Sequence, residues 1–320
     1  MRRLRIFTWH VHGSYLYYLT QADHEFYLPI LPGKPEGYGG RLLGFPWGNN
    51  VYDVPAEKVR NLEFDCILFQ SRQNYLHDQY EILSQSQRQL PRLYLEHDPP
   101  QEHPTNTKHI VDEPEVLLIH VTHFNQLMWD SGETPTRVID HGVTIPANVR
   151  YTGELAKGLV VANGLRSRGR RLGADIFTRV RQSVPLDLVG MDAQSLGGFG
   201  EVPHARLPEF ASKYRFFFHP VRYTSLGLAA CEAMMLGMPI IGLATTELVT
   251  VVENGISGYV DTDRDRLIKR MQEMIANPDL AHRLSEGARK QAQKRFNIQR
   301  FTRDWNEAFL FKAEGRRKMD

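Results

Sequence analysis

Short apolar runs recur along this chain and alternate with longer segments in which apolar residues return every three or four positions. Short apolar runs bounded by turn residues predict buried strands, and helical spacing predicts the helices that cover them. The expected strands are residues 5–9, 25–28, 64–69, 92–95, 115–120, 159–163, 186–190, 216–218 and 239–243. The expected helices are residues 15–20, 75–89, 172–182, 207–212, 226–236, 279–295 and 298–312. This alternation predicts an α/β fold built from doubly wound parallel sheets.

The stretch 214–247 is the most informative part of the chain. Its apolar run at 216–218 predicts a buried strand, and Thr224 or Ser225 is expected to cap the helix that follows. That helix is almost uncharged and carries a single carboxylate, Glu232. A lone carboxylate in a buried helix needs a partner. The partner is either a neighbouring loop or arginine, or the hydroxyl groups of a ligand bound at the ends of the strands.

Four arginines gather in a glycine-punctuated turn between the expected strand 159–163 and helix 172–182. The turn reads GLRSRGRR from Gly164 to Arg171. Guanidinium forks match phosphate oxygens, and a helix N-terminus adds partial positive charge. We therefore expect a diphosphate site here, with a solvated basic loop as the alternative.

The N-terminal half has candidate site residues after two of its expected strands. Gly13 and Ser14 follow the first strand and open a helix, an arrangement that favours anion binding. His97 and Asp98 follow the strand at 92–95, just before two prolines. Asp98 could orient His97, bind an acceptor hydroxyl, or simply form the turn. The Gly-rich, aromatic loop 32–50 is either an acceptor-binding loop with Tyr, Phe and Trp stacking faces or a disordered surface loop.

The C-terminal motifs resemble those of a known family. The run EAM at Glu232, the GMP at Gly237 and the segment ENGISGYV from Glu253 are similar to the signature of retaining GT-B glycosyltransferases, in which two glutamates are separated by seven residues. These enzymes form the group 1, or family 4-like, glycosyltransferases. The resemblance implies a GT-B fold, with two doubly wound Rossmann-like domains facing across a cleft. It also implies transfer of a sugar from a nucleotide-diphosphate sugar to a hydroxyl acceptor, with retention of configuration and without a metal ion.

The resemblance also implies domain roles. An N-terminal, acceptor-side domain is expected over residues 1–146 and a nucleotide-sugar-binding domain over 147–300. Residues 301–320 are expected to form a helix that packs back on the first domain through an apolar stripe. The stripe consists of Phe301, Trp305 and Phe309.

The resemblance also implies roles for individual residues. Arg166 and Arg171 match the family's diphosphate-binding pair, with Arg170 as the alternative to Arg171, and Glu232 matches the ribose-binding glutamate. Backbone amides around Gly227 would hold the phosphate or sugar, and His97 would contact the sugar. The expected catalytic residues are His97, Asp98, Arg166, Arg171 and Glu232. The expected donor-binding residues are Gly13, Ser14, Gly164, Arg166, Arg170, Arg171, Thr224, Ser225, Leu226, Gly227, Leu228 and Glu232.

One position departs from the family. Thr224 stands where the first glutamate of the signature belongs, so the donor sugar could differ from the usual one or activity could be lost. A non-catalytic GT-B partner subunit that binds a nucleotide sugar or glycan therefore stays open, as does another α/β enzyme such as an epimerase or phosphorylase.

Bulk composition excludes some classes of partner. The formal net charge is +2 in 320 residues, which gives no support to nucleic-acid binding. No apolar run is long enough to span a membrane, and no signal peptide fits, so we expect a cytoplasmic protein. The basic ends leave open a peripheral contact with the inner face of the membrane. We expect no metal and no cofactor, a UDP or GDP sugar as donor, and a glycan, lipid-linked or small-molecule acceptor. The oligomeric state cannot be inferred.

Overall fold

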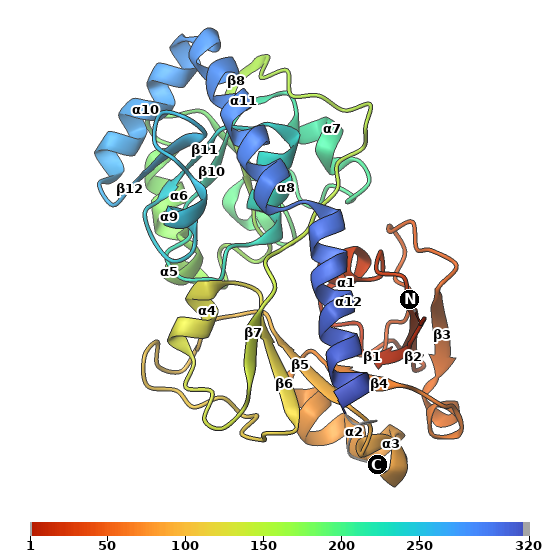
Figure 1. The fold of residues 1–320 in the computed structure, drawn as a ribbon. Helices are drawn as coiled ribbons and strands as arrows, with labels where there is room; N and C mark the ends of the chain where they lie inside the picture. The colour runs from red at the N-terminus through yellow and green to blue at the C-terminus, as the bar shows by residue number, and fades with distance from the viewer. Residues whose placement is uncertain (1, 316–320) are drawn as a thin grey trace. The chain divides into compact units, whose positions relative to one another are not determined.

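The computed structural model describes residues 2–315, and the chain divides into two compact units. Unit 1 contains the chain up to Gly142 and again from Ile298, and unit 2 is Val143–Asn297. Both divisions fall a few residues before the domain boundaries expected at 146/147 and 300/301. Each unit has one parallel sheet with its own apolar core (Figure 1).

Unit 1 is built on a seven-stranded parallel sheet of order β3-β2-β1-β4-β5-β6-β7. The chain begins at the centre, winds to one edge, and then returns to wind to the other edge. The direction reverses between β1 and β4, which makes this the topological switch point. The strands are β1 (Arg5–Thr8), β2 (Glu25–Ile30), β3 (Val51–Pro55), β4 (Cys66–Phe69), β5 (Arg92–Glu96), β6 (Val116–His120) and β7 (Thr136–Val138).

The helices of unit 1 are short, except for the last one. They are α1 (Gly13–Leu19), the 3-10 helix η1 (Ala56–Asn61), the π-helix η2 (Asn74–Asp78), α2 (Gln79–Ile82), α3 (Gln85–Arg88), α4 (His123–Met128) and α12 (Ile298–Gly315). Strands β4 and β6 are buried along their whole length, as parallel strands covered on both faces must be.

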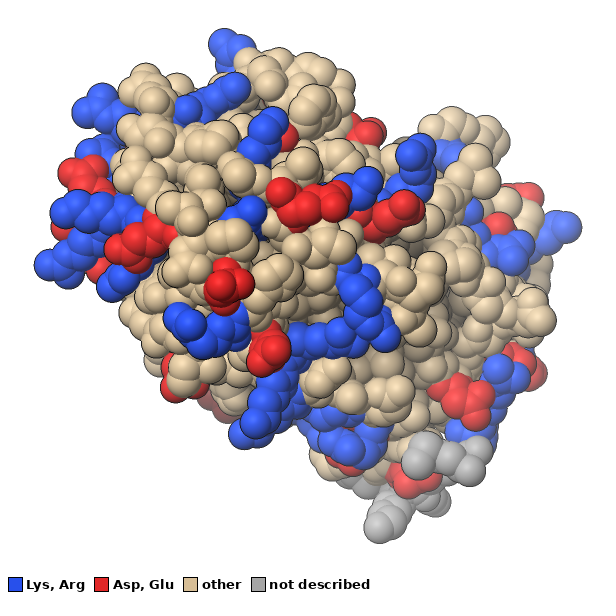
Figure 2. All heavy atoms as spheres, turned by 90° about the horizontal axis from the view of Figure 1, so that it is seen from above, with Lys and Arg blue, Asp and Glu red and all other residues tan. Residues whose placement is uncertain are grey.

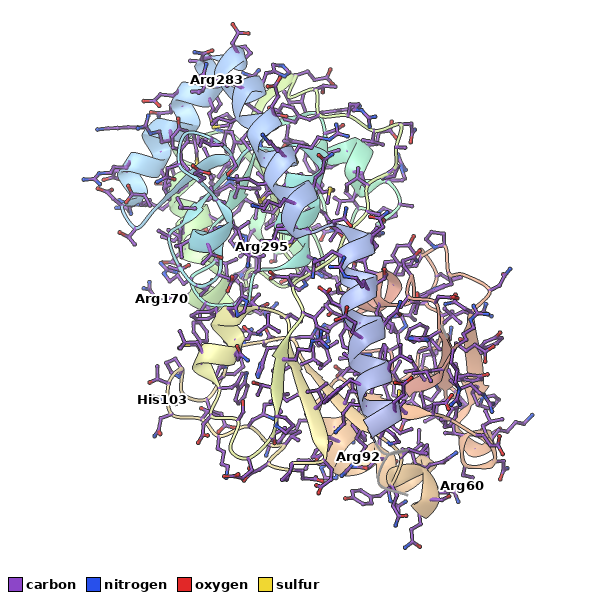
Figure 3. The ribbon with its side chains drawn as sticks, in the orientation of Figure 1. Arg60, Arg92, His103, Arg170, Arg283 and Arg295 are labelled. Carbon is purple, nitrogen blue, oxygen red and sulfur yellow. The ribbon has the colours of Figure 1, made fainter. Side chains whose placement is uncertain are left out.

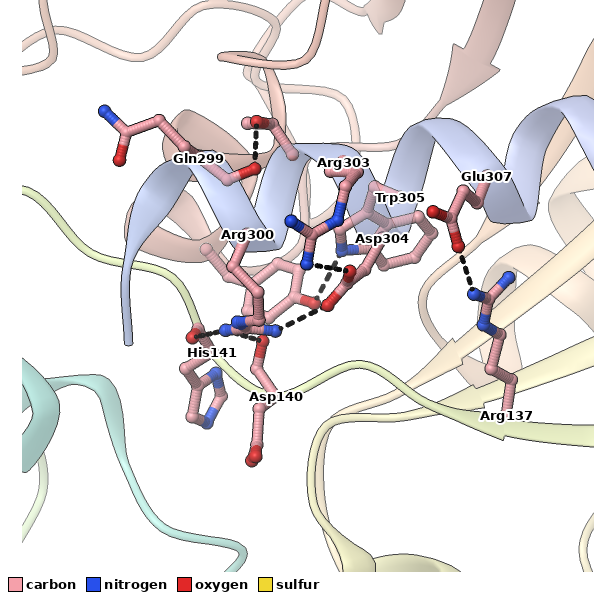
Figure 4. Close-up of polar contacts among 11 residues, drawn as sticks. Arg137, Asp140, His141, Gln299, Arg300, Arg303, Asp304, Trp305 and Glu307 are labelled. Atoms are coloured by element: carbon pink, nitrogen blue, oxygen red, sulfur yellow. Dashed lines mark hydrogen bonds and ion pairs between the residues drawn. The ribbon is translucent and has the colours of Figure 1, made fainter. Parts of the chain in front are cut away.

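The helix α12 belongs to unit 1, although it is far from the rest of that unit in sequence. It contacts α1, β4 and β5, and its expected apolar stripe, Phe301, Trp305 and Phe309, is fully buried. Polar contacts fasten its first turns (Figure 4). Arg300 donates to the carbonyl oxygens of Asp140 and His141, and the Trp305 indole donates to the Tyr15 hydroxyl at 3.2 Å.

Unit 2 is built on a five-stranded parallel sheet of order β12-β11-β10-β8-β9, the other common doubly wound order. Its switch point lies between β8 and β10. The strands are β8 (Leu155–Val161), β9 (Leu186–Val189), β10 (Tyr214–His219), β11 (Ile240–Leu243) and β12 (Gly258–Asp261). The helices are α5 (Gly169–Leu172), α6 (Ala174–Val180), the 3-10 helix η3 (Ala193–Leu196), α7 (Leu207–Ala211), α8 (Leu228–Leu236), α9 (Leu248–Val251), α10 (Arg264–Ala276) and α11 (Pro278–Arg295).

Two of the expected helices are broken. The segment 75–89 is not one helix but η2, α2 and α3, because Leu83 is extended and Ser84 starts a new helix with a capping box closed by Gln87. The segment 172–182 is interrupted at Gly173, which adopts a left-handed conformation with φ of 83°. A Cβ at Gly173 would collide with the carbonyl oxygen of Pro220. Glycine at this position therefore also allows the chain that follows β10 to pass close to the helix break.

Three further expectations need correction. The strand β3 was not expected, because its exposed Tyr52 and Asp53 break the apolar pattern. The cap of α8 is Gly227, with φ of 88°, rather than Thr224 or Ser225. The loop before β3 is not a disordered surface loop, since the Tyr38 side chain is buried in the core of unit 1.

Charged side chains are mixed by sign on the surface. On the face in Figure 2, Lys and Arg side chains lie interspersed with Asp and Glu side chains, as the nearly balanced composition leads one to expect. None of the described helices is long and apolar enough to cross a membrane.

Candidate functional site

The site expected in unit 2 lies at the switch point of its sheet. The arginine turn follows β8, and the segment 220–227 follows β10, so both loops leave the carboxyl ends of neighbouring strands. Open parallel sheets bind ligands at this edge, next to the switch point. Topology alone therefore brings together two groups of residues that are about fifty positions apart in sequence.

Backbone and side-chain contacts join the two loops. The amides of Arg222 and Tyr223 both donate to the carbonyl oxygen of Arg171, at 3.0 and 3.2 Å. Asp175 accepts two hydrogen bonds from the Arg222 guanidinium, at 2.6 and 2.7 Å, and one from Arg170 at 2.9 Å. The ion pair with Arg222, which sequence reasoning missed, lowers the pKa of the Asp175 carboxyl and keeps it ionised. These contacts hold the two loops to each other.

The three candidate arginines differ in how they are engaged. Arg170 projects into solvent with 77% of its side chain exposed and is paired with Asp175 (Figure 3). Arg166 donates to the carbonyl oxygen of Ser195 at 3.0 Å, which uses one of its five donors. Arg171 is half-buried, and its side chain makes no hydrogen bond or ion pair with the described residues. A partly desolvated guanidinium with no acidic partner is suited to bind an anion.

The N-terminus of α8 follows the loop that contacts the arginine turn through Arg222 and Tyr223. The Leu226 side chain is buried, so this segment presents its backbone rather than side chains. Gly227, with φ of 88°, begins a nine-residue helix in which the Ala230 amide donates to the Gly227 carbonyl at 3.2 Å, whereas the two amides before it come too early in the helix to have intrahelical partners. Their partial positive charge adds to that of the arginine turn. Ser225 is also buried, whereas Thr224 is half-buried and makes no side-chain hydrogen bond with the described residues.

Glu232 contacts a neighbouring loop, which is one of the alternatives expected from the sequence, although the sequence did not indicate the residue. Its Oε1 atom lies 3.1 Å from Nε2 of His204, in the loop before α7. The Glu232 side chain is only 13% exposed, so this contact compensates part of its desolvation.

A second buried histidine at this edge was missed by sequence reasoning. His219 ends β10, and its Cε1 atom is the nearest atom to the open position above Gly227. Burial lowers the pKa of His219 to about 4, so the imidazole is neutral at physiological pH. The apolar run FFF before it identified the strand, but a single histidine at a strand end gave no separate signal.

In unit 1, the structure gathers three imidazoles at the carboxyl edge of the sheet. The rings of His97, after β5, and His12, after β1, have centroids 4.1 Å apart. The edge of Tyr15 packs on His97 at 4.9 Å, and Tyr15 also contacts His141 at 5.7 Å. Burial, together with the like charges that His12 and His141 would carry, lowers the pKa of His97 well below its usual value. His97 is therefore a neutral hydrogen-bonding group.

The remaining candidates in unit 1 are Gly13, Ser14 and Asp98. Gly13 begins α1 and lies under Phe45 of the 32–50 loop, since a Cβ there would approach the Phe45 ring at 3.1 Å and His10 Nε2 at 3.3 Å. Ser14 follows within the same turn of helix. The Asp98 backbone is fixed, because its amide donates to Glu96 and its carbonyl accepts from the Trp129 indole, both at 2.9 Å. These contacts fix the backbone at this turn through Glu96 and Trp129 and do not involve the Asp98 side chain.

The expected residues thus fall into two groups, one on each unit. Unit 2 carries the arginine turn, the start of α8 and Glu232, and unit 1 brings the His97 ring close to His12 in the loop before α1. A separate pocket of about 670 Å³ lies at the outer edge of the unit 2 sheet, lined by β12 and α10 residues that include Tyr259 and Arg270. Among residues 2–315, no cluster of three or more His, Cys, Asp or Glu side chains is arranged to hold a metal ion.

Part of the chain matches the model of a known family. Residues 195–291, which include α8 and Glu232, match the family model described as "Glycosyl transferases group 1". The resemblance expected from the motifs is confirmed over that segment. No curated protein matches the chain significantly in sequence.

Solved structures show the fold. Sucrose-phosphate synthase from Thermosynechococcus elongatus aligns with a TM-score of 0.70 at 19% identity, over 97% of this chain and 100% of that one. HepE from Anabaena, in complex with UDP and glucose, aligns with a TM-score of 0.68 at 16% identity, over 96% and 99%. A glycosyltransferase from Rickettsia africae aligns with a TM-score of 0.66 at 12% identity, over 97% and 98%. The chain has the GT-B fold of these glycosyltransferases.

Proposed function

We propose that this protein transfers a sugar from a nucleotide-diphosphate sugar to a hydroxyl acceptor, with retention of configuration and without a metal ion. The observation that carries the proposal is the Arg171 side chain, a half-buried cation with no acidic partner among the described residues. It lies in the turn at the switch point that contacts the loop leading to α8. The family match to residues 195–291 and the complex of HepE with UDP and glucose support the same substrate class.

The chemistry follows from the charge that develops. When the bond between the anomeric carbon and the diphosphate breaks, the leaving diphosphate gains negative charge. Arg166, Arg171 and the first amides of α8 would stabilise that charge, because preorganised donors are most effective where charge appears in the transition state. Fixed cations can do this without a metal ion. Glu232 would accept hydrogen bonds from the ribose hydroxyls, and His97 would contact the sugar.

The other donor-site residues shape the pocket rather than carry charge. Gly164, with φ of 59°, allows the tight turn after β8. Gly227 leaves its Cβ position open, so a sugar or phosphate could approach the backbone there. Thr224 would offer a short hydroxyl in place of a carboxylate, which favours a donor sugar with fewer hydroxyls to bind at that point. UDP or GDP is proposed as the carrier, and a glycan, lipid-linked or small molecule as the acceptor.

The first test is donor binding by calorimetry with UDP, GDP, ADP and dTDP sugars, on the wild type and on Arg171→Gln. Loss of one charge-assisted contact costs about 1.5–3 kcal/mol, so the Kd should rise about 10- to 150-fold. Arg179→Gln is the matched control, because Arg179 is an exposed arginine on α6 of the same unit and is not among the expected donor-binding residues. If none of the sugars binds to the folded protein, the donor site is wrong.

The second test separates an enzyme from a non-catalytic partner subunit. Release of the nucleoside diphosphate is measured with and without acceptors, in buffer with EDTA. Turnover that survives EDTA supports metal-independent transfer, and the anomeric coupling constant of the product reports retention. Tight binding with no release under any condition would favour the partner subunit, for which the replacement at Thr224 is the motivating observation.

A further inference from the structure

A buried glutamine at the switch point of unit 1 links three neighbouring strands. Gln70 directly follows β4, which lies between β1 and β5 in the sheet, and is only 3% exposed. Its side-chain amide contacts Thr8 and Trp9 on the β1 side and His97 on the β5 side. Sequence reasoning passed over Gln70, since a single glutamine after an apolar strand carries no recognisable signal.

Its surroundings determine which way the Gln70 amide points. One end of the amide lies 2.8 Å from the carbonyl oxygen of Trp9, and a carbonyl oxygen can only accept a hydrogen bond. That end must therefore be the NH2 group, which also lies 2.8 Å from the Thr8 hydroxyl oxygen. The other end, Oε1, then faces Nε2 of His97 at 3.3 Å.

The orientation of Gln70 has a consequence for His97. An amide oxygen can only accept, so a hydrogen bond with it requires a proton on Nε2 of the imidazole. The pKa of His97 is low, because of burial and the nearby His12 and His141, so the ring carries one proton and not two. Nδ1 is then left with its lone pair, and it has no hydrogen-bond partner among the described residues.

We propose that Gln70 is a positioning residue that holds His97 in the Nε2–H tautomer, so that His97 presents Nδ1 as a hydrogen-bond acceptor to a hydroxyl of the sugar substrate. The second half of this proposal rests on the proposed glycosyl transfer, and the first half does not. A nitrogen that can only accept requires a hydroxyl that donates. Gln70 and His97 together would thereby select a sugar that has this hydroxyl in the matching orientation. A deoxy sugar would leave Nδ1 of His97 without a hydrogen-bond donor.

The first test is the tautomer of His97 by nitrogen NMR on histidine-labelled protein, with the signals assigned by their loss in His97→Asn. Gln70→Met keeps the length of the side chain and removes the acceptor. Because a neutral hydrogen bond of ordinary strength is lost, the ratio of Nε2–H to Nδ1–H tautomer should fall about fivefold. A His97 that carries its proton on Nδ1 in the wild type, or a ratio that Gln70→Met leaves unchanged, would overturn the proposal.

Gln87→Met is the matched control. Gln87 is a buried glutamine of the same unit whose NH2 group donates to the carbonyl oxygens of Val59 and Leu62, at 2.9 and 2.7 Å, and whose Oε1 accepts from the Ser84 amide. Its loss should destabilise the protein to a similar degree and leave the His97 tautomer ratio at its wild-type value. A tautomer change of equal size in Gln87→Met would mean that general loosening is the cause, and would overturn the proposal.

A second variant decides the case if Gln70→Met does not fold. Gln70→Glu keeps an acceptor toward Nε2 and adds a negative charge, which favours the protonated imidazole. The Nε2 proton should remain, and the His97 titration should move to higher pH by NMR. A titration that does not move would show that residue 70 does not contact His97.

Activity provides the last readout. Transfer by Gln70→Met should show a kcat/KM about fivefold below that of the wild type, with unchanged binding of the nucleoside diphosphate alone, and Gln70→Glu should recover part of the loss. If kcat/KM is unchanged while the tautomer shifts, the role in presenting Nδ1 to a substrate is refuted. If no variant and no wild-type protein transfers sugar, the proposed function fails, whereas the tautomer measurements still decide the role of Gln70.

Discussion

His219 should make unit 2 sensitive to mild acid. Burial at the end of β10 lowers the pKa of this imidazole to about 4, against about 6.5 in an unfolded chain. Between these two values the unfolded state binds the proton and the folded state does not. The contribution of the neutral, buried His219 ring to the free energy of unfolding is therefore fully present above pH 6.5, and it is lost as the pH falls toward 4. From pH 7 to pH 5, linkage predicts a loss of about 2 kcal/mol in the free energy of unfolding.

The assay must report on unit 2 alone. The four tryptophans, Trp9, Trp47, Trp129 and Trp305, all lie in unit 1, so fluorescence cannot follow unit 2. Protein equilibrated in urea at pH 7 or pH 5 is instead given a brief deuterium pulse at one fixed pH. Mass spectrometry of the peptide containing β10 then gives the fraction of unit 2 that is unfolded at each urea concentration.

The decisive comparison is between the wild type and His219→Gln, which cannot take up the proton. The variant should lose about 2 kcal/mol less than the wild type between pH 7 and pH 5. His282→Gln removes an exposed histidine of the same unit and should behave as the wild type does. A difference between wild type and His219→Gln that stays constant with pH would refute the reasoning, whatever the absolute stabilities.

Two further changes test how the loops of the unit 2 site are held. Gly173→Ala should destabilise unit 2 by about 2–4 kcal/mol in the same pulse assay, because the residue has φ of 83° and its Cβ would collide with the Pro220 carbonyl. Gly169→Ala, with φ of 56° and open space around it, should cost only about 1–2 kcal/mol, and equal losses would contradict the collision. Asp175→Asn should cost about 1 kcal/mol near pH 7, since the pair with Arg222 is partly exposed. The pKa of Asp175 is lower in the folded state than in the unfolded state, so the cost of Asp175→Asn should shrink as the pH falls toward the folded-state pKa. Urea titrations at pH 7 and pH 3 measure this cost. A cost that is the same at both pH values would contradict the role of the ion pair.

The sequence by itself determined the class of fold and where the candidate site of unit 2 was expected. Buried parallel strands need apolar side chains on both faces, so runs such as the one at 216–218 stand out without knowledge of their neighbours. The glycines and arginines from Gly164 to Arg171 form a local pattern, because a turn and the start of a helix are built from consecutive residues. The group 1 motifs lie in the same half of the chain, and the family match to residues 195–291 falls there as well.

Only the tertiary structure decided which side chains act together. Asp175 pairs with Arg222, and Glu232 with His204, across separations that no local pattern encodes. The same holds for Gln70, whose contacts with the two neighbouring strands arise from the order β1-β4-β5. Strand order depends on how the whole sheet winds, and this is a property of the assembled core rather than of any segment. The broken helices have the same origin, since the bend at Gly173 is required by the close approach of Pro220.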